Sequence, residues 1–535
     1  MTKLHRSTSR GYLLVLGAIF VYAILSNAWI VDDAYITFRS IWNWHNGYGL
    51  RWNTIERVQL YTHPLWMILI SVCYRITHEF FFTTLAFSCL LCAATGWIMV
   101  RFISREQPWT VVPFALLLLV SKAFMDYTSS GLENPLSYLL VALFYGPLLF
   151  GCRPPHFIRP DPRFEITYYT FIAALAFVNR IDTILLYAPA LCLLIYRGVR
   201  AYRSRLIGPL FAGGLPAVLW TCFAVIYYGF PYPNTYYAKA ASIGIPSNEQ
   251  LQQGVAYFIN SLTWDPPTLI TIGVVLLLIA REGSVRARMG ALGLVAYLYY
   301  VLKVGAISTH MSGRFFALPY FLAVVLAMTL QIRRQSSLAL SALAFGLILV
   351  CPTTPLKANT AYYRCGLDNS GWGRNGILDT RYLVQTNDGS SLFNFDRKKE
   401  MPNMPWYDEG LQFRDSPDDV RIGGHGPAIG FFAFAAGPKK TIVDTLGLGD
   451  ALLARLPTRS KDWGPGHFER NMPEGYEQSV RNHKNLIVDP DLHTYYDKLL
   501  LATQGPIFNL RRFRAIWDLN SGSADSLLLA YSKRH

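Results

Sequence analysis

Long apolar runs separated by short basic loops dominate roughly the first two thirds of the chain. The runs over 11–31 and 206–228 are each long enough to cross the hydrocarbon core of a bilayer as a helix. A helix satisfies its backbone hydrogen bonds internally, so a chain with many such runs is expected to fold as a helical membrane protein. Composition agrees, because 52% of the residues are hydrophobic and only 16% are charged, against about a quarter in soluble domains.

We predict an all-α polytopic membrane domain with eleven spanning helices. The predicted spans lie near 11–31, 82–100, 108–123, 135–150, 166–178, 183–196, 206–228, 268–280, 289–305, 316–331 and 337–351. With the N-terminus in the cytoplasm, every inner loop is basic, as at Arg101 and Arg105 or Arg197 and Arg200, in agreement with the positive-inside rule. The net charge of +15 is therefore attributed to membrane orientation, and no nucleic-acid partner is expected.

The apolar segment His63–Tyr74 is the one ambiguous stretch in this pattern. It is only about twelve residues long, and if it crossed the membrane every later loop would change sides. We therefore predict that it lies in, or dips into, the outer interface. An odd number of spans then places the C-terminus on the extracytoplasmic side.

The composition changes from Pro352 onward, where Gly, Asp, Asn and Pro are frequent and no spanning run remains. We predict two domains, a transmembrane domain over 1–351 and an extracytoplasmic domain over 352–535. In the second, "IGFFAFAAG" and "KKTIVDTLGLGD" indicate strands and turns. The segments "DALLARL" and "HTYYDKLLLATQ" indicate helices, so this domain is expected to be a small α/β unit.

The eight cysteines form no metal-binding pattern. Cys89 and Cys92 have CxxC spacing but lie inside a predicted span, where small buried hydrophobic residues are the usual reading. Cys351 and Cys365 flank the end of the last span and could form a disulfide in an oxidising compartment. No metal site is predicted.

Polar residues gather in five predicted outer loops, close to the apolar spans. The first loop begins with "DDAYITFRSIWNWHNG", and the others contain "SSGLENP", "VNRID", "PYPNTYYAKA" and "STHMSGRFF". Charged groups beside spans are costly and usually functional. Five such loops on one face therefore predict a shared site.

The start of the first outer loop is expected to be a helix. Asp32, Arg39, Asn43 and Asn46 would then share a polar face, with Ile41, Trp42 and Trp44 directed to lipid. The alternative is an interfacial helix whose polar side is merely solvated.

The residue types in these loops suit a lipid-phosphate sugar donor. Carboxylates can act as general base or nucleophile, and Arg, Lys and His near the membrane surface suit a phosphate group. Aromatic and Asn side chains suit a sugar. We therefore expect a site for a phosphate anchored at the membrane with its sugar exposed outside.

The first outer loop resembles a known family signature. The four parts of that signature match Asp32–Ile36, Asn46–Gly49, Asn53–Val58 and Tyr61–Trp66 in this sequence. This pattern is similar to that of polyprenyl-phosphate-dependent glycosyltransferases of the GT-C superfamily. Within them it looks most like the terminal (B-type) arabinofuranosyltransferases of mycobacterial and corynebacterial cell-wall arabinan and related bacterial enzymes.

The resemblance extends over most of the chain but has departures. The later segments "PNTYYAKA", "GRFFALPY", "VDTLGLGD" and "PGHFER" are also similar to the family. His63 stands where the family usually has Ser, and Asn134 stands where Thr is expected. The segment "NRID" matches its family counterpart more weakly.

The resemblance implies a GT-C fold, with interfacial helices in the first outer loop, in a bacterial plasma membrane. It implies transfer of an arabinofuranosyl residue from polyprenyl-phosphate-arabinofuranose to a cell-surface glycan or glycoprotein on the extracytoplasmic side. Another lipid-phosphate sugar such as mannose is an alternative. A lipid-linked sugar transporter is a second alternative, but it should carry polar residues through the membrane and on both faces.

By position, Asp32 or Asp33 would be the catalytic carboxylate, and the resemblance does not settle which one, or whether it is a base or a nucleophile. No cofactor is implied; a divalent cation at these carboxylates with Glu133 lacks supporting ligand spacing.

The other site candidates divide into two groups by chemistry. Those for the donor phosphate are Arg39, Arg57, His63, Lys239, His310 and Arg314. Those for the sugar or the acceptor are Tyr35, Asn53, Glu56, Tyr61, Glu133, Arg180, Asp182, Asn234, Tyr237, Asp444, His467 and Glu469. Structural alternatives remain, since Arg180 could simply pair with Asp182 and Asp444 could only organise a turn.

Overall fold

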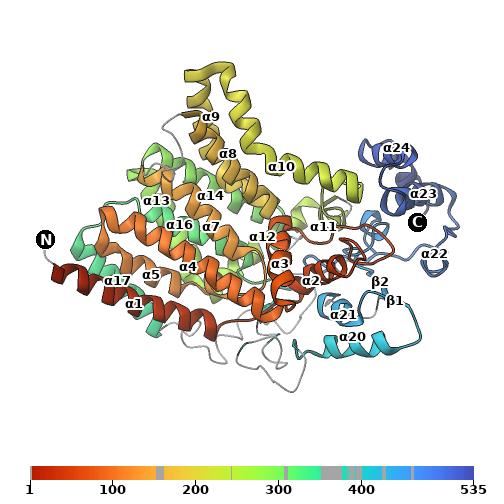
Figure 1. Cartoon of the computed structure of the whole chain (residues 1–535), viewed down its shortest axis with the longest axis horizontal. Coiled ribbons are helices and arrows are strands. Elements are labelled where there is room, and N and C mark those ends of the chain that lie inside the picture. Colours follow the sequence, from red (N-terminus) through yellow and green to blue (C-terminus); the bar gives the residue numbers. More distant parts are fainter. Residues whose placement is uncertain are drawn as a thin grey trace.

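The computed structural model describes residues 3–151, 162–241, 244–305, 311–350, 376–381, 384, 392, 401–423, 429–459 and 463–535. Apolar helices form a bundle, and the elements after residue 401 gather at the end of the molecule away from the N-terminus (Figure 1). The predicted fold class, a helical membrane-type domain followed by a unit with both helices and strands, is confirmed in these terms.

Every predicted span falls on a helix. In chain order these helices are α1 (Lys3–Ser26), α4 (Phe81–Glu106), α5 (Val111–Val120), α7 (Asn134–Phe150), α8 (Pro162–Asn179), α9 (Ile184–Tyr202), α10 (Ile207–Tyr228), α13 (Pro266–Glu282), α14 (Val285–Lys303), α16 (Arg314–Ala327) and α17 (Arg334–Val350). By length and composition, Phe81–Ile103, Ile181–Arg200 and Ile207–Tyr228 could each cross a membrane. The other predicted spans do not meet this criterion individually, so the number of spans and their sidedness stay predictions.

Among the described residues before 351, three long helices lie outside the predicted spans. Two of them fall in segments that were expected not to cross the membrane, and the third was not predicted. α2 (Asp32–His45) and α3 (Pro64–Thr77) are each 14 residues long, well short of the ~20 that crossing requires. The missed helix is α12 (Ser247–Trp264), which meets α13 at an angle of 106°. Its polar first turns hide it from a search for apolar runs.

α16 is the central helix of the bundle, and it positions one charged group of the site. All its residues from Arg314 to Ala327 are buried. It packs against α7, α13 and α14. The helix begins after Gly313, which has a φ of +75° that favours glycine, so Arg314 is fixed at the outer end of the core.

The C-terminal unit is built on two short parallel strands, β1 (Val420–Ile422) and β2 (Thr441–Val443). Its helices are α20 (Pro405–Asp415), α21 (Ile429–Ala436), α22 (Tyr476–Asn482), α23 (Pro490–Gln504), α24 (Leu510–Asn520) and α25 (Asp525–Arg534). The strand predicted in "TIVD" and the helix predicted in "HTYYDKLLLATQ" are confirmed as β2 and α23.

Two expectations for this unit were wrong. "IGFFAFAAG" forms the buried helix α21 rather than a strand, because an apolar run of this length has no periodicity that separates helix from strand. "DALLARL" contains only the short 3₁₀ turn Leu453–Arg455.

The first outer loop and the C-terminal unit share one core. Ile36 and Trp52 from the loop are buried in the same cluster as Phe432 and Ile442 from the C-terminal unit. α2 also packs directly on α21. The expected lipid-facing role of Ile41 is wrong, because its side chain is fully buried. The domain boundary at 351/352 stays a prediction, since residues near it lie outside the described ones.

Asp32 joins α2 to α21. Its carboxylate accepts hydrogen bonds from the backbone N–H groups of Gly430, at 2.9 Å, and Phe431, at 2.6 Å. These amides lie in the first turn of α21, where a carboxylate satisfies otherwise unpaired donors. A Cβ at Gly430 would lie 1.9 Å from the carbonyl oxygen of Asp32, so only glycine permits this approach.

The substitution Asp32→Ala is expected to lower the stability of the protein by about 1–2 kcal/mol, because it leaves two amide donors of α21 without their acceptor. Burial raises the pKa of Asp32 to about 7, with the two N–H groups opposing the shift. Folding raises the pKa of Asp32 from 3.8 to about 7, so the stability that its protonated form adds is complete below about pH 4 and is lost as the pH rises to about 7. The deficit of the variant should therefore shrink from about pH 4 to about pH 7. Thermal unfolding in detergent measures this, with Asp33→Ala as the matched control. An equal loss in both variants would contradict it.

Candidate active site

A cavity of about 530 Å³ lies where the predicted outer loops meet, a volume typical of ligand-binding pockets. Each of the five polar loops predicted to lie outside contributes to its lining, and so does Leu448 of the C-terminal unit. The lining residues are Asp33, Ile36, Thr37, Leu60, Tyr61, Thr62, His63, Leu132, Arg180, Ile181, Asp182, Tyr232, Pro233, Thr235, Tyr236, Lys239, Ala240, Tyr300, Val304, Arg314 and Leu448. Seven residues proposed from the sequence therefore meet here: Asp33, Tyr61, His63, Arg180, Asp182, Lys239 and Arg314.

Glu133 lies behind one wall of this cavity and contacts three basic side chains that line it. Its side chain is 1% exposed and lies 2.7 Å from Arg180 Nη1, 3.1 Å from His63 Nδ1 and 3.9 Å from Arg314 Nη2. Burial alone would raise the pKa of Glu133, but Arg180, then His63 and Arg314, outweigh burial and hold it well below its usual range. Glu133 is therefore an ionised carboxylate with three basic neighbours from three different segments.

Arg180 is held in a fixed orientation by a second carboxylate. Its Nε donates to Asp182 Oδ1 at 2.7 Å, and the hydroxyl of Tyr297 donates to Asp182 Oδ2 at 3.1 Å. The guanidinium also lies 4.9 Å from the ring centroid of Phe315, a cation–π distance. The expected Arg180–Asp182 pair is present, but it forms part of the cavity wall rather than an isolated surface contact.

The two adjacent aspartates of α2 have different surroundings. Asp32 is occupied by the amides of α21, whereas Asp33 faces the cavity with its side chain 35% exposed. Asp33 Oδ2 accepts a hydrogen bond from Arg314 Nη1 at 3.2 Å. Only one of the two carboxylates is thus positioned to meet a molecule in the cavity.

Lys239 supplies a cation across the same cavity. It lies on a π-helical turn, Tyr237–Ala241. Burial lowers the pKa of Lys239, and the negative charge of Asp33 partly offsets that effect. Among the described residues, Lys239 forms no ion pair at 4.0 Å or less, so its charge is available to a ligand.

His467 brings the C-terminal unit into the electrostatics of the site. Its Nδ1 lies 2.9 Å from the carbonyl oxygen of Pro465. Burial, followed by the charge of Lys239, lowers the pKa of His467 to about 4, while the Pro465 contact and Asp33 oppose the shift. The imidazole is therefore neutral at neutral pH and adds no positive charge beside Lys239.

The cavity combines an accessible carboxylate with cationic side chains. Asp33 lines it together with Arg180, Lys239 and Arg314. The two arginines are paired with carboxylates, whereas Lys239 has no such partner among the described residues. Such a site can bind an anion such as phosphate and keep a carboxylate oxygen free for proton transfer.

Four residues proposed for ligand binding instead bind backbone. Arg39 donates to the carbonyl oxygens of Trp52, Ala433 and Lys440, and Arg57 to those of Tyr227 and Gly505. Asn53 exchanges hydrogen bonds with the backbone of Ile442, and Asn234 donates to the carbonyls of Gly447, Leu448 and Asp450. The assignment of these side chains to substrate is corrected accordingly, because their donors are already used.

Four further candidates also lie away from the cavity lining. Tyr35 packs edge-on against Phe434 and tilted against Phe431. Tyr237 lies under the guanidinium of Arg455. Asp444 accepts three backbone N–H bonds, from Leu446, Leu448 and Gly449, in the turn-organising role that was the alternative. Glu469 is 61% exposed beside Arg459.

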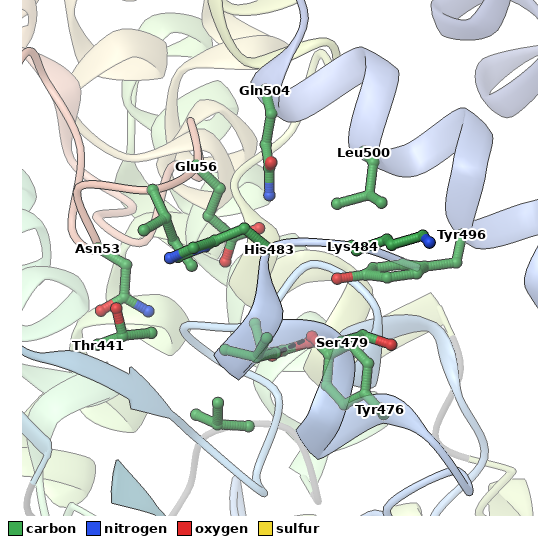
Figure 2. A pocket seen from close by; sticks show the side chains of 14 residues that line it. Asn53, Glu56, Thr441, Tyr476, Ser479, His483, Lys484, Tyr496, Leu500 and Gln504 are labelled. Carbon is green, nitrogen blue, oxygen red and sulfur yellow. Dashed lines mark hydrogen bonds between the residues drawn. The ribbon is translucent and has the colours of Figure 1, made fainter. Parts of the chain in front are cut away.

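Glu56 points into a second, much smaller pocket of about 20 Å³ (Figure 2). Tyr476 and Tyr496 share that lining. Burial, then the charge of Asp450, raises the pKa of Glu56 well above its usual range, although Arg455 opposes the shift. The pocket has room for little more than a water molecule, so Glu56 belongs to the packing of the C-terminal unit. His310 lies outside the described residues.

Sequence reasoning missed several lining residues. Thr37 Oγ1 lies 2.9 Å from His63 Nε2 and so fixes the ring that contacts Glu133. Its position one helical turn after Asp33 was a usable signal, because residues four apart share a helix face. Tyr300 also lines the cavity, but nothing in its local sequence separates it from ordinary aromatic packing.

The described residues contain no group of three or more His, Cys, Asp or Glu side chains arranged to hold a metal ion. Cys89 and Cys92 are free thiols. Cys351 and Cys365 lie outside the part of the chain that the structure describes.

Comparisons with known proteins give a distant likeness. No protein-family model matches the chain, and no curated protein matches it. Two solved structures of ArnT from Cupriavidus metallidurans are similar in fold. The structure bound to undecaprenyl phosphate has a TM-score of 0.47 and 12% identity, over 83% of this chain and 77% of that one. The apo structure has 0.48 and 13%, over 84% and 77%. Because proteins of one fold often differ in function, function has to be inferred from the site itself.

The substitution Glu133→Gln is expected to destabilise the protein by about 3 kcal/mol or more, because it leaves buried basic groups without their shared counter-ion. The pKa of Glu133 is lowered in the folded state, so its contribution is present above about pH 4.5 and lost as the pH falls through the folded pKa. The difference between variant and native protein should therefore be full at neutral pH and diminish under acidic conditions.

Thermal unfolding across that pH range tests this expectation. Glu469→Gln, at an exposed position, is the matched control and should leave the unfolding temperature unchanged. A Glu133→Gln protein as stable as the native one at neutral pH would contradict the assigned network.

Proposed function

We propose that the chain is a membrane glycosyltransferase of the GT-C type that transfers a sugar from a polyprenyl-phosphate donor to an acceptor outside the membrane. The single observation that carries the proposal is the cavity that joins the accessible carboxylate of Asp33 to the cations Arg314 and Lys239. A donor phosphate needs the cations, and an acceptor hydroxyl needs the carboxylate. The cavity opens among outer loops that adjoin apolar helices, so a lipid carrier has an apolar environment beside it.

In the proposed reaction Asp33 acts as general base. A carboxylate oxygen of Asp33 takes the proton of the acceptor hydroxyl while the hydroxyl oxygen bonds to the anomeric carbon of the sugar. The bond between that carbon and the phosphate oxygen breaks, and its electron pair stays on the polyprenyl phosphate. Lys239 and Arg314 stabilise the negative charge that develops there. Inversion at the anomeric carbon fits this route, whereas retention would require a carboxylate nucleophile or a front-face mechanism.

Glu133, His63, Arg180 and Thr37 are positioning residues in this scheme. They lock the wall that carries Arg314, so the phosphate site is formed before the substrate arrives. Asp32 has a similar role, because it holds the start of α2 against α21.

We further propose arabinofuranose as the donor sugar and a cell-surface glycan or glycoprotein as the acceptor, in a bacterial plasma membrane with the site outside. The first-loop motif resemblance, including Asp32–Ile36 and Asn53–Val58, supports this choice. A hexose donor such as mannose is the competing specificity. Purified protein assayed with polyprenyl-phosphate-arabinofuranose and polyprenyl-phosphate-mannose and a labelled arabinan acceptor separates them. Transfer of mannose alone would overturn the arabinose proposal.

The substitution Asp33→Asn is expected to reduce sugar transfer by about 10² to 10⁴-fold, the range that loss of a general base produces. The unfolding temperature should change little, because the Asp33 side chain is partly exposed and the amide preserves its shape. The transfer assay above measures the effect, with Glu469→Gln as control. Full activity in Asp33→Asn would contradict the catalytic assignment, and transport without transfer would favour the flippase alternative.

The substitution Lys239→Met is expected to lower kcat/KM for the donor by about 10 to 100-fold, because a charge-assisted hydrogen bond contributes about 1.5–3 kcal/mol. Methionine is an unbranched side chain one atom shorter than lysine, and it removes the charge together with the N–H donors. Stability should be preserved or slightly improved, since burial disfavours the ammonium. Initial rates at varied donor concentration measure the loss, and Lys239→Arg should recover part of it. An unchanged kcat/KM in Lys239→Met would remove this residue from the phosphate site.

A further inference from the structure

α24 presents an apolar face with nothing packed on it among the described residues. Leu510 is 88% exposed and Trp517 71%, and Phe513 and Arg514 are exposed beside them. These four positions recur at the spacing of one helix face. Phe508, just before the helix, is 84% exposed. Large aromatic side chains in this pattern are costly to leave in water.

The opposite face of α24 is fixed to the outer end of a membrane-type helix. Arg512 is fully buried and donates to the carbonyl oxygens of Ile226 and Tyr227, the last residues of α10, and to that of Ala502. Asn520 donates to the carbonyl of Gly229. α24 therefore lies beside the end of α10, as Figure 1 also shows.

α10, beside which α24 lies, has an exposed apolar surface. It is long and apolar enough to cross a membrane, and only 11% of its apolar stretch is buried in the protein. Phe211, Leu219 and Phe223 along it are exposed, as expected for side chains in contact with acyl chains. α24 is held beside the end of this exposed helix by Arg512.

Charge on α24 also fits a bilayer surface. Arg511 and Arg514 are exposed, whereas the nearest carboxylate, Asp518, is paired with Lys498 at 2.5 Å. Tryptophan is typical of the membrane interface, and exposed arginines attract anionic headgroups.

We propose that α24 lies in the headgroup region of the outer leaflet, with Leu510, Phe513 and Trp517 inserted and Arg511 and Arg514 on anionic phosphates. Interfacial helices have this combination of an apolar face and flanking basic residues. Through Arg512, the contact would hold the C-terminal unit, and with it the cavity wall at Leu448, at a fixed height above the bilayer. The proposal depends on α10 lying in a membrane and not on the sugar-transfer reaction.

Photo-crosslinking of the full-length protein tests the insertion. Benzoylphenylalanine replaces Trp517 in one variant and Asp419, which is 79% exposed near β1, in the control. Both proteins are reconstituted in vesicles of phosphatidylethanolamine and phosphatidylglycerol, irradiated, and analysed by mass spectrometry for lipid adducts. We expect at least a tenfold excess of lipid adducts at position 517. Equal yields at both positions, or adducts at 517 to a second copy of the protein in place of lipid, would overturn the proposal.

The headgroup preference is tested in the same vesicles. The double variant Arg511→Gln and Arg514→Gln, with the crosslinker at position 517, should shift the ratio of phosphatidylglycerol to phosphatidylethanolamine adducts toward the bulk composition. Its unfolding temperature in detergent should not change, because both side chains are exposed. An unchanged adduct ratio in the folded variant would overturn the role of these arginines.

Discussion

The buried carboxylate of Glu133 is the interaction on which the site depends. Three basic groups reach it from separate parts of the chain: His63 from the first outer loop, Arg180 from the end of α8 and Arg314 from the start of α16. An ionised carboxylate cannot remain buried without such partners, and the basic groups equally need the carboxylate. This mutual requirement brings three loops to one wall and gives the cavity its shape.

Hydrogen bonds from buried arginines to backbone carbonyls fix the irregular segments to one another. Arg39, Arg57 and Arg512 are buried, and each donates to backbone carbonyl groups from more than one segment. A guanidinium has five donors in a rigid plane, so one side chain can satisfy several carbonyls in loops and in the last turns of helices, such as Ala433 in α21 and Tyr227 in α10. These arginines thus stabilise the loops that present the site, without meeting a ligand.

This distinction explains how far the sequence could predict the site. Length and hydropathy located the helices, because burial in lipid imposes a strong pattern. Charge located the loops, and seven candidate residues do line one cavity. The sequence alone could not distinguish the role of Arg39 from that of Arg314. Arg39 binds carbonyl groups of residues about 400 positions later in the chain, whereas Arg314 faces the cavity. Both are arginines beside apolar spans, and only the tertiary contacts assign them.

The two adjacent aspartates show that accessibility to a substrate, more than pKa, decides which carboxylate can act as the base. The pKa of Asp32, raised by burial to about 7, would suit a general base working near neutral pH. Yet its oxygens are occupied by the amides of Gly430 and Phe431, and the backbone of Gly430 covers it. Successive residues on a helix point about 100° apart, so Asp33 turns from α21 toward the cavity. The pair therefore divides between one carboxylate that holds the helix in place and one that can reach a substrate.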